Sequence, residues 1–176
     1  MQAQRHLSKE QRASYESINE LLIALCLTLE RRMTKRNIFA NTLGCNVIYA
    51  NGDKWGDYLN LSLPMQDGAE IYAAIMGRIE NFEKENPNEH VIHHGITSIS
   101  LYVANFVDNT MVQYNLFEDN SKKDHLRKVV YELKDKYGKH KLMRAIELRE
   151  GEIMQDVIGF GSVKDLYNED KTDFID

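Results

Sequence analysis

The chain has 176 residues, of which 43% are hydrophobic and 28% charged, a composition typical of one globular domain. Two prolines and ten glycines exclude collagen-like and low-complexity proteins. No run of about 18 apolar residues predicts a membrane span, and the first residues lack the apolar segment of a signal peptide. Two cysteines, Cys26 and Cys45, are too few for a disulfide framework, so we expect a cytoplasmic protein with no membrane partner.

The net charge of −5 is concentrated near the C-terminus. Residues 150–176 contain eight acids and two bases, whereas residues 1–149 contain 19 acids and 20 bases. The acidic total argues against a protein that coats nucleic acid, but it is compatible with a small basic site. One short basic cluster consists of Arg31, Arg32, Lys35 and Arg36. Charge alone favours a helix C-terminus over a phosphate-contacting patch for this cluster.

A long helix is the first predicted element. Ser8 and Gln11 form a capping-box pattern, and apolar residues spaced three or four apart follow from Tyr15 to Met33. This spacing predicts a helix over roughly 9–36. Cys26 lies within the apolar stripe, so we interpret it as a buried apolar residue rather than a nucleophile.

Two alternating runs on either side of Asn51–Gly52 predict a β-hairpin. A tight two-residue loop would mix the apolar and polar faces of the two strands. A loop made of Asn51, Gly52 and Asp53 keeps the apolar residues on one face, so we predict the longer, bulged loop. The pairs expected from that loop are Tyr49–Trp55, Cys45–Leu59 and Leu43–Leu61.

Asp67 is a predicted helix cap, and the stripe from Ile71 to Phe82 predicts a second helix. Alternation then resumes over residues 96–107. If a short first strand lies within residues 1–8, the order becomes βαββαβ. This order predicts an α+β fold of the split-βαβ type, in which two helices cover one face of an antiparallel sheet.

The second face of this sheet is expected to stay open. Hydroxyl, amide and tyrosine side chains suit hydrogen bonding to phosphates or sugars, and they equally suit contact with water. The residues predicted there are Thr42, Asn46, Lys54, Tyr58, Asn60, Ser62, Ser98, Ser100 and Tyr102.

A third helix is predicted by the apolar stripe from Leu126 to Tyr137, and Gly138 is expected to end it. Motifs for catalysis are missing from the sequence. His90, His93 and His94 lack Cys or carboxylate partners at metal-ligand spacing, and neither a P-loop nor a Gly-x-Ser-x-Gly elbow occurs. The motifs therefore indicate a binding module that holds no metal or cofactor of its own.

The βαββαβ order and two later segments resemble the C-terminal part of Y-family DNA polymerases of the UmuC/DinB (ImpB/MucB/SamB) type. Val91–Ile96 is similar to the segment that enters the last strand of their little-finger domain. Leu126–Gly138 and Met143–Ala145 are similar to the tail of the Gram-positive-type members. The family's usual basic residue before the last strand is His93 here, which implies a weaker and pH-dependent attraction for phosphate.

The segment Gln113-Tyr-Asn-Leu-Phe117 resembles the pentapeptide with which bacterial proteins bind the sliding clamp. By this resemblance Gln113 would hydrogen-bond at a pocket rim, and Leu116 and Phe117 would fill an apolar pocket. Tyr114 departs from the preferred Leu. The alternative is that Leu116 and Phe117 pack against the following helix as a hydrophobic staple.

The resemblance implies non-sequence-specific DNA binding and clamp tethering in DNA repair, as part of an SOS-type translesion polymerase acting on damaged templates. The expected partners are primer–template DNA and the bacterial sliding clamp. The parent polymerase would use magnesium, but no palm segment is recognisable in this sequence, so the chain alone is not expected to polymerise. The candidate DNA-binding residues are Lys54, Tyr58, Asn60, Ser62, His93, Ser98 and Ser100, supported by Arg31, Arg32, Lys35 and Arg36.

The expected organisation has three parts. Residues 1–108 would form the little-finger-like domain, 109–120 a linker with the clamp peptide, and 121–176 a helix and acidic tail. Two alternatives stay open: a stand-alone non-catalytic regulator that competes for the clamp, and a small-molecule-binding or self-associating α/β domain.

Overall fold

A computed structural model of the protein describes residues 1–108, 120–138, 142–143 and 145. Its elements alternate as the sequence predicts, and the conditional first strand is present. They are β1 (Gln2–His6), α1 (Lys9–Arg12), α2 (Tyr15–Arg36), β2 (Ile38–Tyr49), β3 (Lys54–Met65), α3 (Gly68–Glu85), β4 (Ile96–Asp108) and α4 (Asn120–Tyr137).

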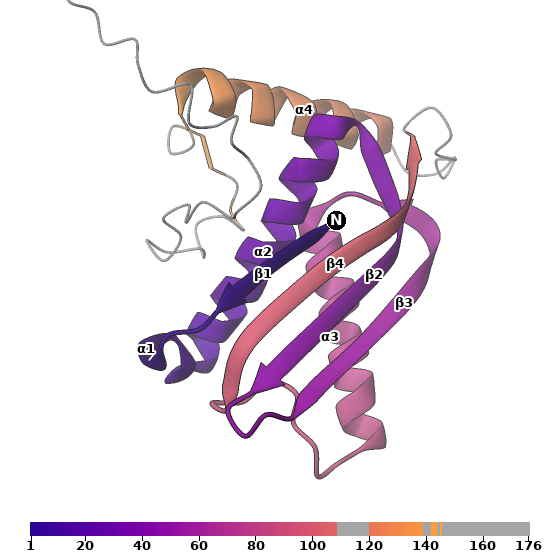
Figure 1. The fold of residues 1–176 in the computed structure, drawn as a ribbon. Helices are drawn as coiled ribbons and strands as arrows, with labels where there is room; N and C mark the ends of the chain where they lie inside the picture. The colour runs from indigo at the N-terminus through magenta and orange to yellow at the C-terminus, as the bar shows by residue number, and fades with distance from the viewer. Residues whose placement is uncertain (109–119, 139–141, 144, 146–176) are drawn as a thin grey trace, which may run out of the picture.

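The four strands form one antiparallel sheet in the order β1-β4-β2-β3. The parallel strands of each βαβ unit are separated by a strand of the other unit: β4 lies between β1 and β2, and β2 lies between β3 and β4. Helices α2 and α3 cover the same face of this sheet (Figure 1). The α+β split-βαβ fold is therefore confirmed.

An aliphatic core fills the space between the two helices and the sheet. Leu22 and Leu29 of α2, Ile75 of α3, and Leu43 and Leu101 of the central strands are all buried in one cluster. Alternation puts these strand residues on the helix side of the sheet, and burial of so much apolar surface is the main force that joins the layers. Cys26 is also fully buried, as expected for a residue of the apolar stripe.

The helix predicted over residues 9–36 is broken near its start. Helix α1 ends at Arg12, and Ser14 is in an extended conformation with φ −128° and ψ 132°. The Ser14 hydroxyl accepts hydrogen bonds from the amides of Glu16 and Ser17 and so begins a new helix. A serine cap inside a helical pattern competes with the backbone, which explains the break.

The hairpin pairs predicted from the sequence are wrong by two residues. Val47 lies opposite Trp55 and Leu43 opposite Leu59, because the loop is Ala50–Gly52 and not 51–53. The Asn51 side-chain oxygen accepts from the Asp53 amide, and Gly52 adopts φ 90°, which together tighten the turn. A slip of two residues keeps every side chain on its face, so the predicted apolar and polar faces are correct.

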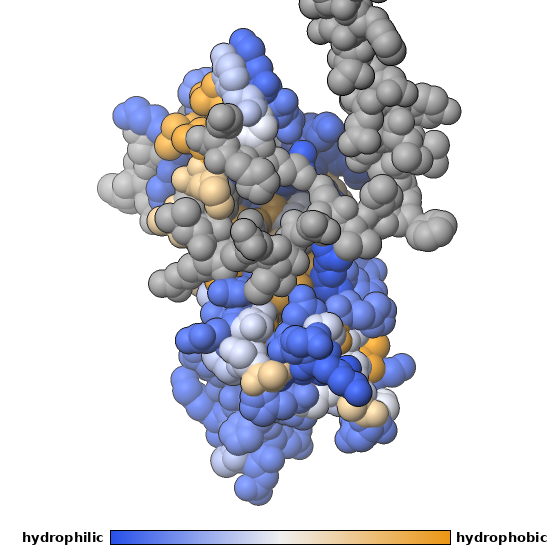
Figure 2. Space-filling model, turned by 90° about the vertical axis from the view of Figure 1, so that its left-hand side faces the viewer, coloured by the Kyte–Doolittle hydropathy of each residue, from blue (hydrophilic) through white to orange (hydrophobic). Residues whose placement is uncertain are grey.

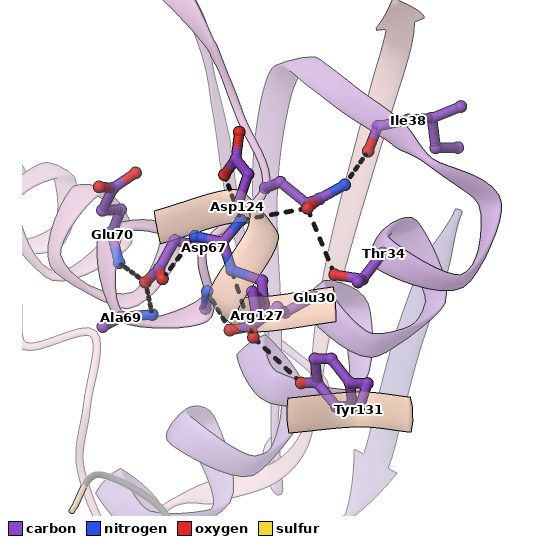
Figure 3. Close-up of polar contacts among 11 residues, drawn as sticks. Glu30, Thr34, Ile38, Asp67, Ala69, Glu70, Asp124, Arg127 and Tyr131 are labelled. Carbon is purple, nitrogen blue, oxygen red and sulfur yellow. Dashed lines mark hydrogen bonds and ion pairs between the residues drawn. The ribbon is translucent and has the colours of Figure 1, made fainter. Parts of the chain in front are cut away.

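Helix α4 crosses the C-terminal part of α2 (Figure 1) and turns polar residues toward it. Arg127, only 8% exposed, forms ion pairs with Asp67 and Asp124 at 2.9 Å each and with Glu30 at 3.7 Å (Figure 3). The fully buried Glu30 also accepts from the Gly68 amide at 2.6 Å and from the Tyr131 hydroxyl at 3.1 Å. We call these five residues (Glu30, Asp67, Asp124, Arg127 and Tyr131) the Arg127 cluster.

The apolar stripe that predicts α4 faces away from this contact. Leu126 is 63% exposed, and Leu133 and Tyr137 are exposed as well. Figure 2 shows hydrophobic residues at the height of α4, above a largely hydrophilic lower half. The helix ends at Tyr137 and Gly138 has φ 93°, as the sequence predicts for a glycine stop.

None of the helices in the described ranges is long and apolar enough to cross a membrane.

Candidate nucleic-acid interface

The sheet face opposite α2 and α3 is the candidate interface, because no described helix covers it (Figure 1). The register of β2 shifts between Ala40 and Thr42 and between Ile48 and Tyr49. Between these shifts the even-numbered residues of β2 and their partners on the neighbouring strands point to this face, in rows across the four strands. One row is Gln4, Ser100, Asn46 and Gly56, and the next row is Gln2, Tyr102, Gly44 and Tyr58. Lys54, Asn60 and Ser62 extend the face along β3. We call this surface the open face.

Two glycines make the open face flat. A β-carbon at Gly44 would overlap the Tyr102 ring, so that ring lies across Gly44 in the direction of β3. In the same way a β-carbon at Gly56 would overlap the side-chain oxygen of Asn46. Tyr58 lies in the same row as Tyr102 and is 60% exposed beside the flat surface at the two glycines. The result is a shallow surface of two phenol rings surrounded by amides.

Between the two register shifts, the rows of the open face include no Asp or Glu, although the chain has 27 acids. Asp108, at the end of β4 opposite Ile38, lies beyond these rows. The nearest strand acid, Asp57, is odd-numbered and points to the helix side, where it pairs with Arg78 of α3 at 2.6 Å. Lys54 and His6 are the bases of the face, both exposed. A face without acids does not repel a polyanion, even in a protein of net charge −5.

Four of the predicted DNA-binding residues lie side by side on β3. Lys54, Tyr58, Asn60 and Ser62 are exposed on the open face. Asn60 is held in place by the Thr42 hydroxyl, which donates to its side-chain oxygen at 3.0 Å.

Ser98 and Ser100 lie on the same face but are buried, Ser98 at 2% exposure. The Ser98 hydroxyl donates to the Arg5 carbonyl at 3.1 Å, and the Gln2 amide donates to Ser100 at 2.6 Å. Gln4 also donates to Ser98 at 3.2 Å. A ligand on this face would therefore meet Gln2 and Gln4 above the two serines.

His93 lies beyond the end of the sheet and not on the open face. Its ring stacks on Tyr49 with centroids 4.7 Å apart, and its Nδ1 accepts from the Gly95 amide at 3.0 Å. His93, Tyr49, Lys54, Trp55 and Phe82 line one hollow of about 680 Å³. Because Nδ1 accepts a hydrogen bond, Nε2 is the ring nitrogen that can donate to a ligand in this hollow. Lys54 lines the hollow and also lies on the open face, so it connects the two.

The four bases of the predicted basic cluster lie at the C-terminal end of α2, on the opposite side of the sheet (Figure 1). Arg31 pairs with Asp135 of α4 at 3.4 Å, and Arg32 donates to the Gln2 carbonyl at 2.6 Å. Lys35 and Arg36 are exposed. The structure therefore gives Arg31 and Arg32 intramolecular partners and does not bring the cluster onto the open face.

The predicted clamp-binding residues Gln113, Leu116 and Phe117 lie outside the described residues. Among the residues that are described, no three His, Cys, Asp or Glu side chains come together as a metal site. His94 instead contacts the Arg12 carbonyl through Nδ1 at 2.7 Å.

The prediction did not assign a binding role to Gln2, Gln4, Gly44 or Tyr102. The first strand was only conditional, so its glutamines were not placed on a face. Their signal is the alternation from Gln2 to Leu7, in which Ala3 and Leu7 are buried and the residues between them alternate. The close approach of Tyr102 to Gly44 needs the cross-strand register and has no local signal.

Comparison with known proteins identifies a family model that matches this chain. A model of the impB/mucB/samB family C-terminal domain matches residues 1–116. Among solved structures, the chain is similar to one described as "Complex of beta-clamp processivity factor and little finger domain of PolIV". That similarity has 14% identity and a TM-score of 0.43, and it covers 66% of this chain and 97% of the other. No curated protein matches the sequence.

Proposed function

The chain belongs to the impB/mucB/samB family through that family's C-terminal domain, and from this membership we propose that it holds DNA for a translesion polymerase. In this proposal the protein acts in DNA repair in the cytoplasm, on damaged templates. Phosphoryl transfer and its magnesium ions belong to a palm domain and not to these residues. The chain supplies binding only.

The observation that carries the proposal is the acid-free open face. Its exposed groups are amides, hydroxyls and phenols with Lys54 and His6 as bases, and these groups match the acceptors of a sugar–phosphate backbone. Contacts to phosphate and sugar carry no base information. Such contacts suit a polymerase that must accept bases whose edges are altered.

Clamp tethering is the second part of the proposal and rests on the sequence Gln113-Tyr-Asn-Leu-Phe117. Gln113 would hydrogen-bond at the rim of a clamp pocket, and Leu116 and Phe117 would enter it. A tether raises the effective concentration of the open face at DNA, so two bases can suffice for the direct grip.

DNA binding is tested with the full chain and a fluorescent primer–template in anisotropy titrations at several salt concentrations. We expect affinity to fall as salt rises, and Lys54→Ala to reduce the slope of log affinity against log salt by about 1. Lys9→Ala, which removes an exposed lysine from α1, is the matched control. No binding at low salt, or an affinity that does not respond to salt, would refute the proposal.

Clamp binding is tested by retention of the chain on an immobilised bacterial sliding clamp. Replacing Leu116 and Phe117 by Ala should abolish retention. The control is Leu126→Ala with Leu133→Ala, which removes two exposed apolar side chains from α4. Equal loss in both variants would indicate non-specific apolar contact and would refute the tether.

A further inference from the structure

The two tyrosines of the open face carry an inference that rests on the proposed DNA binding and narrows it. We propose that Tyr58 and Tyr102 form a stacking platform for unpaired bases, so that the open face prefers single-stranded DNA to a duplex. The chemical class of ligand is a strand whose bases are free to stack, such as the template ahead of a primer end.

The geometry of the platform comes from the register. Tyr102, Gly44 and Tyr58 are neighbours in one row on three adjacent strands. Neighbouring strands are about 4.8 Å apart, so the two tyrosine α-carbons are roughly 10 Å apart. Because the Tyr102 ring crosses Gly44, it occupies the space between the two α-carbons and lies close to the backbone of the sheet. Both rings are therefore accessible from the same side of the sheet.

The charge of the open face decides between two modes of binding. A duplex offers phosphates and stacked, enclosed bases, so proteins that hold it rely on many Lys and Arg contacts. Lys54 and His6 alone would give a weak grip of that kind. Stacking of a base on an aromatic side chain contributes about 1–3 kcal/mol per base and needs no charge, but it requires bases outside a double helix.

The remaining groups of the open face fit this mode. Gln2, Gln4 and Asn46 are exposed amides beside the rings, and they can donate to base edges or sugars without demanding one sequence. Aromatic residues on a four-stranded sheet are known to stack two or three bases of single-stranded RNA in another binding module. The absence of Asp and Glu from the face removes repulsion of the phosphates that run beside the bases.

The test compares affinity for a short fluorescent oligothymidylate with affinity for a duplex of the same length. Tyr58→Ala and Tyr102→Ala should each weaken single-strand binding by roughly 5- to 150-fold, and Tyr58→Phe and Tyr102→Phe should retain it. Tyr15→Ala, which removes another exposed tyrosine on the helix side, should have no effect. Irradiation with an iodouracil-substituted strand should cross-link Tyr58 or Tyr102, identified by mass spectrometry.

Gly44→Ala tests the flat geometry while both rings remain present. Its β-carbon must displace the Tyr102 ring, so single-strand affinity should fall toward that of Tyr102→Ala. The platform is overturned if the primer–template still binds while both Tyr→Ala variants stay within twofold of the wild type. Failure of the wild type to bind any DNA would instead overturn the proposed function. Circular dichroism verifies that each variant is folded.

Discussion

Helices α3 and α4 have the same length of 18 residues and both carry an apolar stripe, but they are attached in opposite ways. Helix α3 buries its stripe of Ile71, Ile75 and Ile79 against the sheet and α2. Helix α4 leaves Leu126, Leu133 and Tyr137 of its stripe exposed and docks on α2 through the Arg127 cluster. Only α3 lies within the residues that match the family domain.

This difference determines how easily each helix can be detached from the rest of the domain. Apolar burial is non-directional and depends on no titrating group, so α3 stays in place as long as the domain is folded. A buried ion cluster needs every partner, because any member left alone is a desolvated charge. Helix α4 is therefore the part of the described structure that a single substitution or a change of pH can release.

The largest effect is expected from Arg127→Met, which leaves Glu30 and Asp67 without their cation. Breaking a buried pair on one side destabilises by about 3–5 kcal/mol, and here the loss acts on the docking of α4. Hydrogen exchange should show α4 amides losing protection while the sheet keeps it. Lys136→Met, which removes an exposed lysine near the C-terminal end of the same helix, is the control. Retained protection in Arg127→Met would refute the conditional attachment.

Ile75→Ala tests the other side of the comparison. Deleting this buried side chain should lower the free energy of unfolding of the whole domain by about 2–5 kcal/mol, measured by urea denaturation. Leu126→Ala on α4 removes an exposed apolar side chain and should stay within about 0.5 kcal/mol of the wild type. Similar losses for the two variants would show that α4 also buries its stripe.

Tyr131→Phe removes one hydrogen bond to Glu30 and keeps the ring. Loss of a bond to a buried charge should weaken α4 docking by about 1–2 kcal/mol, less than the loss of Arg127. Hydrogen exchange of α4 reports the change. An unaltered exchange rate would indicate that this hydrogen bond does not contribute to the docking of α4.

Acidification should loosen α4 through Asp67. Burial alone would raise the pKa of Asp67, but the charge and hydrogen bond of Arg127, with the Glu70 and Ala69 amides, hold that pKa below its usual value. The docking energy from Asp67 is therefore complete above the usual carboxyl pKa and is lost as pH falls through the lowered value. Other charged groups around Asp67 are Glu30, Glu70, Lys123 and Asp124.

Glu70 acts in the opposite direction, because burial and the charge of Asp67 raise its pKa. The Asp67 contribution is isolated by Asp67→Asn, since Asn still caps α3. This variant should show a smaller loss of α4 protection between neutral and acidic pH than the wild type. Equal pH profiles would mean that Asp67 does not control the docking.

The smallest effect is expected at the two thiols, which report on the apolar layer. Burial raises the pKa of both, that of Cys45 to about 12, so neither is a thiolate near neutral pH. Both should resist alkylation by iodoacetamide in the wild type and also in Arg127→Met, and both should react in denaturant. Rapid labelling in Arg127→Met would show that release of α4 opens the core.

The sequence predicted the body of the fold because its local signals agree with its tertiary contacts. Alternation placed Lys54, Tyr58 and Asn60 on the open face, and the isoleucine stripe placed α3. The break at Ser14 was missed because one cap competed with a long helical pattern. The hairpin register was missed because the Asn51 side chain, not the alternation, sets the loop.

The candidate site was only partly predictable. Ser98 has the parity of an open-face residue, but its burial under Gln4 depends on a strand far away in sequence. The docking face of α4 could not be predicted either, because Glu30, Asp67 and Arg127 are distant along the chain and the apolar stripe suggested the opposite face.

The hydrogen bond from Arg32 to the Gln2 carbonyl has a consequence for how the protein behaves among its own copies. Residues such as Met1 exchange backbone hydrogen bonds with β4, so the Gln2 carbonyl points outward from the edge strand. An exposed strand edge is a template for pairing with a second chain. The guanidinium occupies that acceptor, and on the opposite edge Pro64 of β3 has no N–H to offer. Both edge strands, β1 and β3, are thus protected against edge-to-edge aggregation. The open face is then the surface of the sheet that remains accessible.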